Sequence, residues 1–480
     1  MPHTTETADI RSVYLVGICG TAMASLAGML HERGYDVRGS DEHVYPPMST
    51  YLARLGIPVL EGYTNEHLRT LRPDLVVIGN AIPRTNSEAI EVLDADLAYL
   101  SMPEAVYSLF IRGRHSVVVA GTHGKTTTTS LLAWVLESAG RDPGMMVGGI
   151  PLNFDRNYKL GGGEHFVIEG DEYNTAFFDK GPKFLHYRAN TLIVNNIEFD
   201  HADIFPDIDA IVSAFGEVIE RVEPGDTIIA NGDDPLVGRL APLSRANWIT
   251  FGESAGNWIG VNEVELIPEG SRFGLLRDGR PWLRVSSPLS GRHNVLNAAA
   301  VFAAANNLGL KDEEIAEGLR TFQGIKRRME VRGVEKGVTV IDDFAHHPTA
   351  VGTTLEGARA RYPGARIWAL FEPRSISSGR KEFEAQYRAA LARADRVIIG
   401  PIFHQKRYET IYGIDRMMSV EDLVEGLAQL GVEAFAIPDF DDIAALVADE
   451  ADPGDVVIAM SSGAFGGVHE KILERLRTRR

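Results

Sequence analysis

Short apolar runs alternate along the chain with longer segments in which apolar residues recur every three or four positions. In the first 110 or so residues, Val13–Val16, Asp36–Arg38 and Leu75–Ile78 have the strand pattern, and Met23–Arg33 and Pro103–Phe110 have the helix pattern. β-Branched runs predict buried strands, and a period near 3.6 predicts helices. Their alternation predicts βαβ units built on a parallel sheet.

The same alternation continues to the end of the chain in two further units. Ser101-Met-Pro-Glu-Ala is expected to be a linker, the second unit begins at Arg114, and Arg327-Arg328 opens the third. In the second unit we expect strands at Phe166–Glu169 and Thr191–Asn195, a strand-rich stretch at Trp258–Val285, and helices at Ile208–Val222, Asn294–Leu308 and Lys311–Phe322. In the third we expect strands near Val338–Asp342, Ile367–Phe371, Val397–Ile399 and Val456–Met460. We therefore predict an α/β protein with three domains, at residues 1–111, 112–328 and 329–480.

Composition agrees with a folded protein of several domains. The 480 residues are too many for one core, and 44% hydrophobic with 24% charged residues is ordinary for a globular protein. A formal charge of −18 disfavours a nucleic-acid surface, which needs a basic footprint. The single cysteine, Cys19, excludes an intramolecular disulfide. The N-terminus lacks a signal-peptide pattern and no apolar run reaches about 18 residues, so we expect a cytoplasmic protein with no membrane partner.

The most informative motif is Gly121-Thr-His-Gly-Lys-Thr126. The apolar run Val117–Val119 precedes it and a helical segment, Ser130–Glu137, follows it. Glycines let backbone N–H groups approach phosphate oxygens, a helix N-terminus favours negative charge, Lys125 supplies a cation and Thr126 a hydroxyl for Mg²⁺. The motif predicts an ATP site; the alternative is a glycine turn that merely joins two elements.

Two clusters of carboxylates follow strands in the same unit. Glu169-Gly-Asp-Glu-Tyr ends one strand, and Glu198-Phe-Asp-His201-Ala-Asp203 follows another. Ligands bind at the carboxyl ends of parallel strands, and such oxygen and nitrogen donors suit Mg²⁺ beside phosphates. Taken singly, each acidic residue could equally be a solvated loop charge.

The first unit carries a second glycine turn. Gly17-Ile-Cys-Gly20 precedes a helix, and Asp41 follows the second strand. The arrangement resembles a dinucleotide fingerprint, but it is GxxG rather than GxGxxG, so it favours another nucleotide with its diphosphate at the helix N-terminus over NAD.

Further polar groups lie near the second boundary and in the third unit. We expect Asn294 to cap its helix, and Arg328 at the boundary could reach a phosphate. His346 and His347 follow a strand, and Pro348 fits the first turn of the next helix. Because no partner ligand lies at metal-site spacing along the chain, we expect this loop to face a substrate. Arg374 and the helix start at Ser461–Gly467 could each hold a carboxylate.

Taken together, these motifs resemble those of the Mur ligase superfamily, the ATP-dependent amide-forming enzymes of peptidoglycan synthesis and recycling. The resemblance covers the whole chain, and its segments are GICGTAM, AGTHGKTTT, NNIEFDHAD, GRHNVLNAAA, RRMEV and DDFAHHPTA. It implies a Rossmann-like N-terminal domain that binds a UDP-sugar, a central P-loop ATPase-like domain, and a Rossmann-like C-terminal domain that binds the incoming peptide. DEYNTAFFDK (residues 171–180) and FEPRS (residues 371–375) resemble the branch whose acceptor is the recycled tripeptide L-alanyl-γ-D-glutamyl-meso-diaminopimelate.

The resemblance also implies roles for individual residues. UDP-N-acetylmuramate would be activated by ATP through an acyl phosphate, with Mg²⁺, in two ions, as cofactor. Lys125, Glu169, His201 and His346 would be catalytic, and Thr126, Glu169 and His201 would hold metal. The residues implied at ATP are Gly121, Thr122, His123, Gly124, Lys125, Thr126, Thr127, Asn294 and Arg328. Those implied at the UDP-sugar are Gly17, Gly20, Thr21 and Asp41, and those at the peptide are His346, Arg374 and Ser461.

One departure from the family is visible in the sequence. Several relatives use a carbamylated lysine to bridge the second metal, but no lysine occurs here between Lys183 and Lys311. A carbamyl-lysine in that place is excluded. The alternatives left open are a ligase that adds free L-alanine to the same UDP-sugar, a non-catalytic sugar-nucleotide sensor, and an NAD-dependent oxidoreductase. We expect a monomer or weak homodimer, with closure about a hinge at Arg327–Val331.

Overall fold

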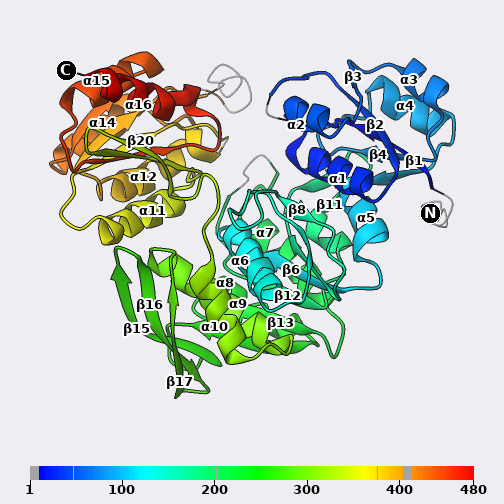
Figure 1. The fold of residues 1–480 in the computed structure, drawn as a ribbon, viewed down its shortest axis with the longest axis horizontal. Coiled ribbons are helices and arrows are strands. Elements are labelled where there is room, and N and C mark those ends of the chain that lie inside the picture. Colours follow the sequence, from blue (N-terminus) through cyan, green and yellow to red (C-terminus); the bar gives the residue numbers. More distant parts are fainter. Residues whose placement is uncertain are drawn as a thin grey trace.

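Three large β-sheets, one in each lobe, divide the molecule into three lobes (Figure 1). The structure is a computed structural model that describes residues 10–46, 48–200, 204–375, 377–403, 413 and 416–479. The N-terminal and C-terminal lobes lie side by side in Figure 1, and the middle lobe lies below both. The α/β class and the three-domain organisation predicted from the sequence are therefore confirmed.

The N-terminal sheet is wholly parallel, in the order β3-β2-β1-β4-β5. Its strands are β1 (Ser12–Val16), β2 (Asp36–Asp41), β3 (Val59–Glu61), β4 (Leu75–Ile78) and β5 (Tyr99–Ser101). The helices are α1 (Thr21–Glu32), α2 (Met48–Arg54), α3 (Asn65–Leu71), α4 (Ser87–Asp94) and α5 (Met102–Val106), which runs into a π-helical turn at Tyr107–Ile111. Ser101 does not begin a linker, because its hydroxyl and Glu104 form a capping box that starts α5.

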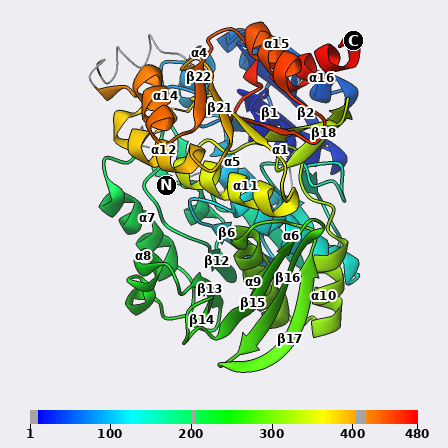
Figure 2. The same cartoon turned by 90° about the vertical axis from the view of Figure 1, so that its left-hand side faces the viewer.

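The middle domain has a ten-stranded sheet, in the order β17-β16-β15-β14-β13-β12-β6-β9-β7-β8. The strands are β6 (His115–Ala120), β7 (Gly144–Met146), β8 (Tyr158–Lys159), β9 (His165–Glu169), β12 (Thr191–Val194), β13 (Thr227–Asn231), β14 (Asn247–Gly252), β15 (Ile259–Ile267), β16 (Gly270–Arg277) and β17 (Arg280–Ser287). A separate hairpin joins β10 (Asn174–Ala176) and β11 (Asp179–Pro182). The strands β15–β17 form an antiparallel extension at one end of the sheet (Figure 2).

Helices cover the parallel part of this sheet. They are α6 (Lys125–Ser138), α7 (Ile208–Glu220), α8 (Pro235–Gly238), α9 (Arg292–Asn307) and α10 (Asp312–Thr321), with 3₁₀ turns at Lys183–His186 and Ala241–Leu243. The alanine-rich face of α9 is buried against α6 and the sheet. Asn294 lies within the first turn of α9 and is not its cap, because the helix starts at Arg292 after Gly291.

The C-terminal sheet has the order β18-β19-β23-β20-β21-β22, and only the edge strand β18 is antiparallel to its neighbour. Its strands are β18 (Glu330–Glu335), β19 (Val338–Asp343), β20 (Ile367–Phe371), β21 (Arg396–Ile399), β22 (Glu433–Ala436) and β23 (Val456–Met460). The helices are α11 (Pro348–Arg361), α12 (Glu384–Leu391), α14 (Val420–Gln429), α15 (Phe440–Glu450) and α16 (Val468–Thr478), with 3₁₀ turns at Ser377–Gly379, Lys381–Phe383 and Phe465–Gly467. Pro348 occupies the first turn of α11, as predicted.

Both outer domains contact the middle domain. Asn157 Nδ2 donates to Ser25 Oγ of α1 at 2.7 Å, and the rings of Tyr99 and Phe178 meet edge to face at 5.1 Å. On the other side, Thr349 Oγ1 of α11 donates to Glu198 Oε2 at 2.6 Å. The loop after β12 is therefore joined to the C-terminal domain.

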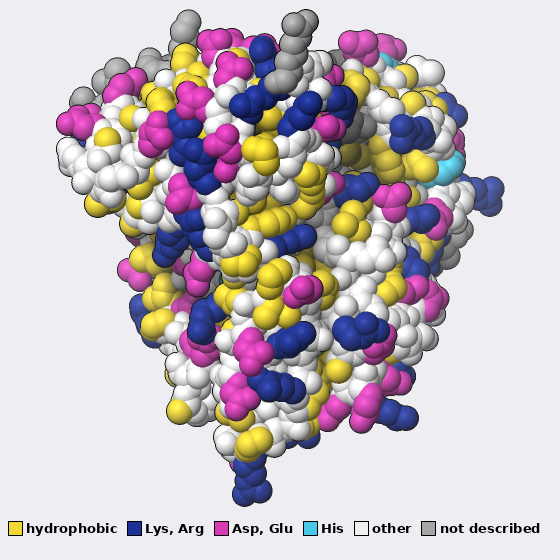
Figure 3. All heavy atoms as spheres, turned by 60° about the vertical axis from the view of Figure 1, so that its left-hand side comes forward, with side chains coloured by type: hydrophobic (Ala, Val, Ile, Leu, Met, Phe, Trp, Pro, Cys, Tyr) yellow, Lys and Arg dark blue, Asp and Glu magenta, His cyan; other side chains and the backbone are white. Residues whose placement is uncertain are grey.

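The surface carries charges of both signs. On the face shown in Figure 3, basic and acidic side chains are interspersed and form no extended patch of one sign. Among the described residues, no helix combines the length and the apolar character that crossing a bilayer requires.

Candidate functional site

A cleft of about 1330 Å³ lies where the three domains meet. The N-terminal domain contributes Thr21, the middle domain contributes Thr122–Thr127 and Glu169, and the C-terminal domain contributes His346. This volume exceeds the roughly 300–1,000 Å³ of a typical small-molecule pocket. The cleft can therefore hold more than one ligand.

The glycine loop between β6 and α6 forms one wall of the cleft. Gly124 is the N-cap of α6 and has a φ of +81°, the left-handed region that favours glycine. A Cβ at this position would lie 2.6 Å from Asn297 Oδ1 and 2.9 Å from Asn195 Nδ2. The loop is thus held against α9 and the end of β12, with the N-terminus of a 14-residue helix directed into the cleft.

Lys125 makes the main electrostatic contact of the loop. Its ammonium donates to Gly121 O at 2.7 Å and lies 2.8 Å from Glu172 Oε2. Burial alone would lower the pKa of Lys125, but Glu172, Asp171 and Glu169 outweigh it and leave the pKa raised. Lys125 is therefore a fixed positive charge beside the loop.

The carboxylate of Glu169 lies beside the start of α6, at the end of β9. Gly148 N–H donates to Glu169 Oε1 at 2.7 Å, and the Thr126 hydroxyl hydrogen-bonds the same carboxylate. Burial raises the pKa of Glu169, whereas these hydrogen bonds and Lys125 oppose the rise. A carboxylate and a hydroxyl that meet beside a phosphate-type loop are the oxygen donors that Mg²⁺ prefers, so these residues fit that ion. His201, the third predicted metal ligand, lies outside the described residues.

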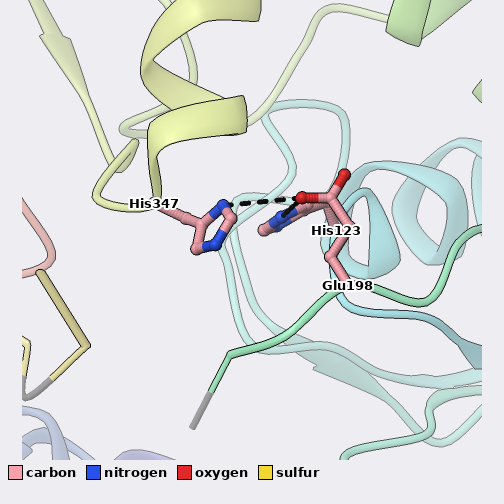
Figure 4. A group of neighbouring side chains, drawn as sticks. All are labelled: His123, Glu198 and His347. Carbon is pink, nitrogen blue, oxygen red and sulfur yellow. Dashed lines mark ion pairs between the residues drawn. The ribbon is translucent and has the colours of Figure 1, made fainter. Parts of the chain in front are cut away.

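A second group of side chains joins the loop to the C-terminal domain (Figure 4). Glu198 Oε2 lies 3.5 Å from His123 Nε2 and 3.7 Å from His347 Nδ1, and the two imidazole centroids are 4.7 Å apart. Burial opposes ionisation of Glu198, but His123, Thr349 and His347 outweigh it and lower its pKa to about 2. Burial beside His123 lowers the pKa of His347 to about 4, so its ring is neutral at pH 7.

His346 presents a neutral imidazole to the cleft. Burial lowers its pKa, and its Nδ1 lies 3.0 Å from Phe344 O. Because a carbonyl only accepts, Nδ1 carries the proton and Nε2 carries the lone pair. Tyr387 OH donates to the backbone oxygen of His346 at 2.5 Å and fixes the loop.

Asn294 and Arg328 both line the cleft. Asn294 Nδ2 donates to Ser290 O at 2.8 Å and its Oδ1 accepts from Asn297 at 3.2 Å. The Arg328 guanidinium lies 5.2 Å from the centroid of Phe344, and no ion pair to it occurs within the part of the chain that the structure describes. Arg328 is therefore available to an anion.

The predicted UDP-sugar residues are close together, but only Thr21 lines the cleft. Asp41 accepts from Cys19 N–H at 2.9 Å and from His43 N–H at 3.1 Å, so it organises the turn after β1. Gly17 has a φ of +82°, and Gly20 is the N-cap of α1. In this arrangement the Asp41 carboxylate hydrogen-bonds the backbone of the turn after β1 and does not line the cleft.

The two predicted peptide contacts, Arg374 and Ser461, do not line the cleft, whereas Ser375 and Ser462 do. Arg374 Nη1 lies 3.6 Å from Glu372 Oε1, and its guanidinium stacks on Phe403 at 3.6 Å. Ser461 Oγ donates to Glu372, which is buried.

Several residues at the site were given no individual role from the sequence, although Glu198 and His347 were noted there. They are Glu172, Asn195, Glu198, Asn297, Asp343 and His347. All of them lie within motifs recognised from the sequence, so the signal was the motif itself. Their partners come from distant segments, and spacing along the chain does not reveal them.

The fold and the loop define a class of three-domain α/β proteins with a phosphate-type loop in the middle domain. Family models match all three domains: the Mur ligase family catalytic domain at residues 12–114, the Mur ligase middle domain at 119–305, and the Mur ligase glutamate ligase domain at 327–463. The chain belongs to the Mur ligase family and is a ligase.

Individual relatives match over nearly their full length. The chain is 40% identical to UDP-N-acetylmuramate–L-alanyl-γ-D-glutamyl-meso-2,6-diaminoheptandioate ligase of Escherichia coli K12, covering 97% of this chain and 98% of that protein. It is 34% identical to UDP-N-acetylmuramate–L-alanine ligase of Agathobacter rectalis, covering 96% and 98%. A crystal structure of a murein peptide ligase from Psychrobacter arcticus 273-4 superposes with a TM-score of 0.73 at 34% identity, covering 98% and 99%.

Proposed function

We propose that this chain joins the lactoyl carboxylate of UDP-N-acetylmuramate to the α-amine of L-alanyl-γ-D-glutamyl-meso-diaminopimelate, using ATP, in peptidoglycan recycling. The observation that carries the proposal is the shared cleft in which the phosphate loop of the middle domain faces residues of both outer domains. The 40% identity to the E. coli enzyme of that name supports the choice of acceptor.

In the first step, the carboxylate attacks the γ-phosphorus of ATP and forms an acyl phosphate and ADP. The step brings anionic oxygens together, so its barrier is largely electrostatic. Lys125 and the N–H groups at the start of α6 offset this charge, and Arg328 reaches the phosphates from the hinge. Nucleotide phosphates would replace Glu172 as the ion-pair partner of the Lys125 ammonium.

Mg²⁺ would be held by Thr126 and Glu169, with His201 as the expected ligand of a second ion. When bound, it supplies further positive charge at the transferred phosphoryl group. The Asn294 amide would contact the adenine, and Gly17, Gly20, Thr21 and Asp41 would form the UDP end of the cleft.

In the second step, the α-amine attacks the acyl carbon, a C–N bond forms, and the C–O bond to phosphate breaks. The amine must lose a proton for this to occur. The Nε2 lone pair of His346 is suited to accept that proton because Nδ1 already donates to Phe344 O. Arg374 and Ser461 do not line the cleft, so they would affect binding of the distal peptide carboxylate indirectly, by positioning the loops that carry Ser375 and Ser462.

A comparison of acceptors tests the proposal. Phosphate release should be measured with ATP and UDP-N-acetylmuramate plus either the tripeptide or free L-alanine. We expect kcat/KM for the tripeptide to exceed that for L-alanine by at least about 100-fold, a difference of about 2.7 kcal/mol. A higher kcat/KM with L-alanine would contradict the proposal and identify an L-alanine-adding ligase. The absence of turnover with either acceptor would favour a non-catalytic sugar-nucleotide sensor.

A further inference from the structure

The His123–Glu198–His347 cluster has the composition of a transition-metal site. Its ligand atoms all lie within 4.8 Å of one another. His123 comes from the phosphate loop, Glu198 from the loop after β12, and His347 from the start of α11, so three separate segments converge (Figure 4). We propose that these three residues bind a Zn²⁺-class divalent ion that joins the middle domain to the C-terminal domain.

The spacing is already near that of a bound ion. Two ligands bonded to zinc at 2.0–2.1 Å with tetrahedral angles lie about 3.3 Å apart. The Glu198 oxygen lies 3.5 Å from His123 Nε2 and 3.7 Å from His347 Nδ1, so these two distances need to contract by only a few tenths of an ångström. The two histidine nitrogens lie within 4.8 Å of each other and must approach by up to about 1.5 Å. His347 is 4% exposed and its backbone is fixed at the cap of α11, which limits how far the site can spread.

An unsatisfied polar atom gives an independent indication of a ligand. Nε2 of His123, the ring nitrogen that faces Glu198, is buried and has no hydrogen-bond partner among the described residues. Buried ring nitrogens without partners are uncommon and call for an explanation. His347 Nδ1 accepts only a long bond, 3.4 Å, from Thr349 N–H, which an ion would displace at small cost.

The donor set selects the kind of ion. Two imidazoles and one carboxylate are a zinc-type set, with a fourth position left for water, whereas Mg²⁺ prefers oxygen ligands. Imidazole must be neutral to bind a metal, and His347 satisfies this condition at pH 7. Thr126 and Glu169, the residues that fit Mg²⁺, form a different cluster, and both offer oxygen donors.

An ion in this position would have a mechanical effect. It would add metal bonds to the hydrogen bond from Thr349 to Glu198, the contact that now holds α11 against the loop after β12. The C-terminal domain would thereby be fixed against the phosphate loop. This inference rests on the cluster's geometry and does not depend on the acceptor.

Metal binding can be measured on the full chain without nucleotide or substrate. The protein is stripped with a chelator, dialysed, and titrated with Zn²⁺ by calorimetry and with Co²⁺ by visible absorption, both with Mg²⁺ in excess. We expect one Zn²⁺ per chain, a Co²⁺ band typical of four or five ligands, and a higher melting temperature with Zn²⁺. A wild-type chain that binds no Zn²⁺ at micromolar concentration would overturn the proposal.

Matched variants locate the ion. His347→Gln and Glu198→Gln should each weaken Zn²⁺ binding by more than about tenfold, because even partners outside the ligand shell are worth about 10–100-fold. His346→Gln removes the neighbouring imidazole and should leave Zn²⁺ affinity unchanged, as should Glu169→Gln at the Mg²⁺ cluster. Circular dichroism of the metal-free variants checks that they fold. If His347→Gln does not fold, the Zn²⁺ affinity of Glu198→Gln decides whether the cluster binds the ion. Equal Zn²⁺ affinity in all four variants, or its loss only in Glu169→Gln, would refute the assignment.

Discussion

At the scale of single residues, the site is organised by charges that are buried in pairs. Lys125 and Glu172 are the clearest case, with the ammonium 2.8 Å from a carboxylate that is 3% exposed. Removing one partner of such a pair leaves the other charge buried, which typically costs about 3–5 kcal/mol. The phosphate loop therefore depends on Lys125 for both stability and chemistry.

These two roles can be separated. Lys125→Ala should lower kcat by at least about 10²–10³-fold, because it removes a preorganised positive charge. It should also lower the free energy of unfolding. Adding Glu172→Gln should recover much of that stability without recovering activity. Denaturant unfolding and steady-state kinetics measure the two effects, and a double variant that regained activity would show that Lys125 is not required for the reaction.

His293 gives a prediction about pH. Burial, with contributions from Arg328 and His123, lowers its pKa from 6.5 to about 4. Between pH 6.5 and 4 the unfolded chain binds a proton that the folded protein does not, so the stability due to neutral His293 is complete above pH 6.5 and is lost as the pH falls towards 4. The loss is about 1–3 kcal/mol.

Chemical unfolding between pH 7 and 4 checks this. His293→Gln should flatten the decline relative to the wild type. His31→Gln is the matched control, because it also removes one imidazole, at the exposed end of α1. Its free energy of unfolding should depend on pH as that of the wild type does. An equally steep decline in His293→Gln would assign the pH dependence to other groups.

At the scale of elements, sequence patterns were informative where burial and periodicity were strong. Leu75–Ile78 has the predicted bounds of β4, and α7 was predicted to within two residues. Short, partly exposed strands such as β3 and the β10–β11 hairpin gave no apolar run to detect. Pairing in such strands is decided by tertiary neighbours, which local propensity does not encode.

The candidate site divides in the same way. Lys125, Thr126 and Glu169, which line the cleft, could be proposed from the sequence because a strand, a loop and a helix carry their chemistry locally. The approach of His347 to His123 and Glu198 depends on how two domains pack, so spacing along the chain could not predict it.

The start of α6 supports a prediction at this scale. Gly124→Ala would place a methyl group 2.6 Å from Asn297 Oδ1 at a φ of +81°, so the loop must shift. We expect nucleotide affinity to fall by more than about tenfold and stability by more than the roughly 1–2 kcal/mol of left-handed backbone strain.

Gly140, after the other end of α6, is the matched control. Its φ is +72° and a Cβ there would meet nothing within 4 Å. Gly140→Ala should therefore cost only the backbone strain and leave nucleotide binding unchanged. Fluorescent ATP-analogue titration separates the two positions, and equal affinities in both variants would contradict the steric argument.

At the scale of the whole molecule, the three domains meet at a cleft larger than a typical small-molecule pocket. Arg327 anchors the boundary between the middle and C-terminal domains, with its guanidinium donating to Ser461 O at 2.8 Å and to Gly463 O at 2.5 Å. Thr349 and Glu198 form a second contact across the same boundary. Phe199 also packs against the hydrophobic core of the C-terminal domain and stacks on Phe383. For domains within one chain, relative motion is the default expectation.

We therefore expect the molecule to become more compact when substrates bind. Small-angle scattering should show a smaller radius of gyration with a non-hydrolysable ATP analogue plus UDP-N-acetylmuramate than with neither, since in the proposed binding mode the two ligands together would bridge walls of the cleft that belong to different domains. Lys125→Ala, which weakens the nucleotide's hold on the loop, should shift the transition to higher nucleotide concentration without changing the ligand-free radius. Identical scattering with and without saturating ligands would contradict this expectation. It would mean that the structure with the Thr349–Glu198 hydrogen bond is already the closed form, and that catalysis needs no further movement about Arg327–Val331.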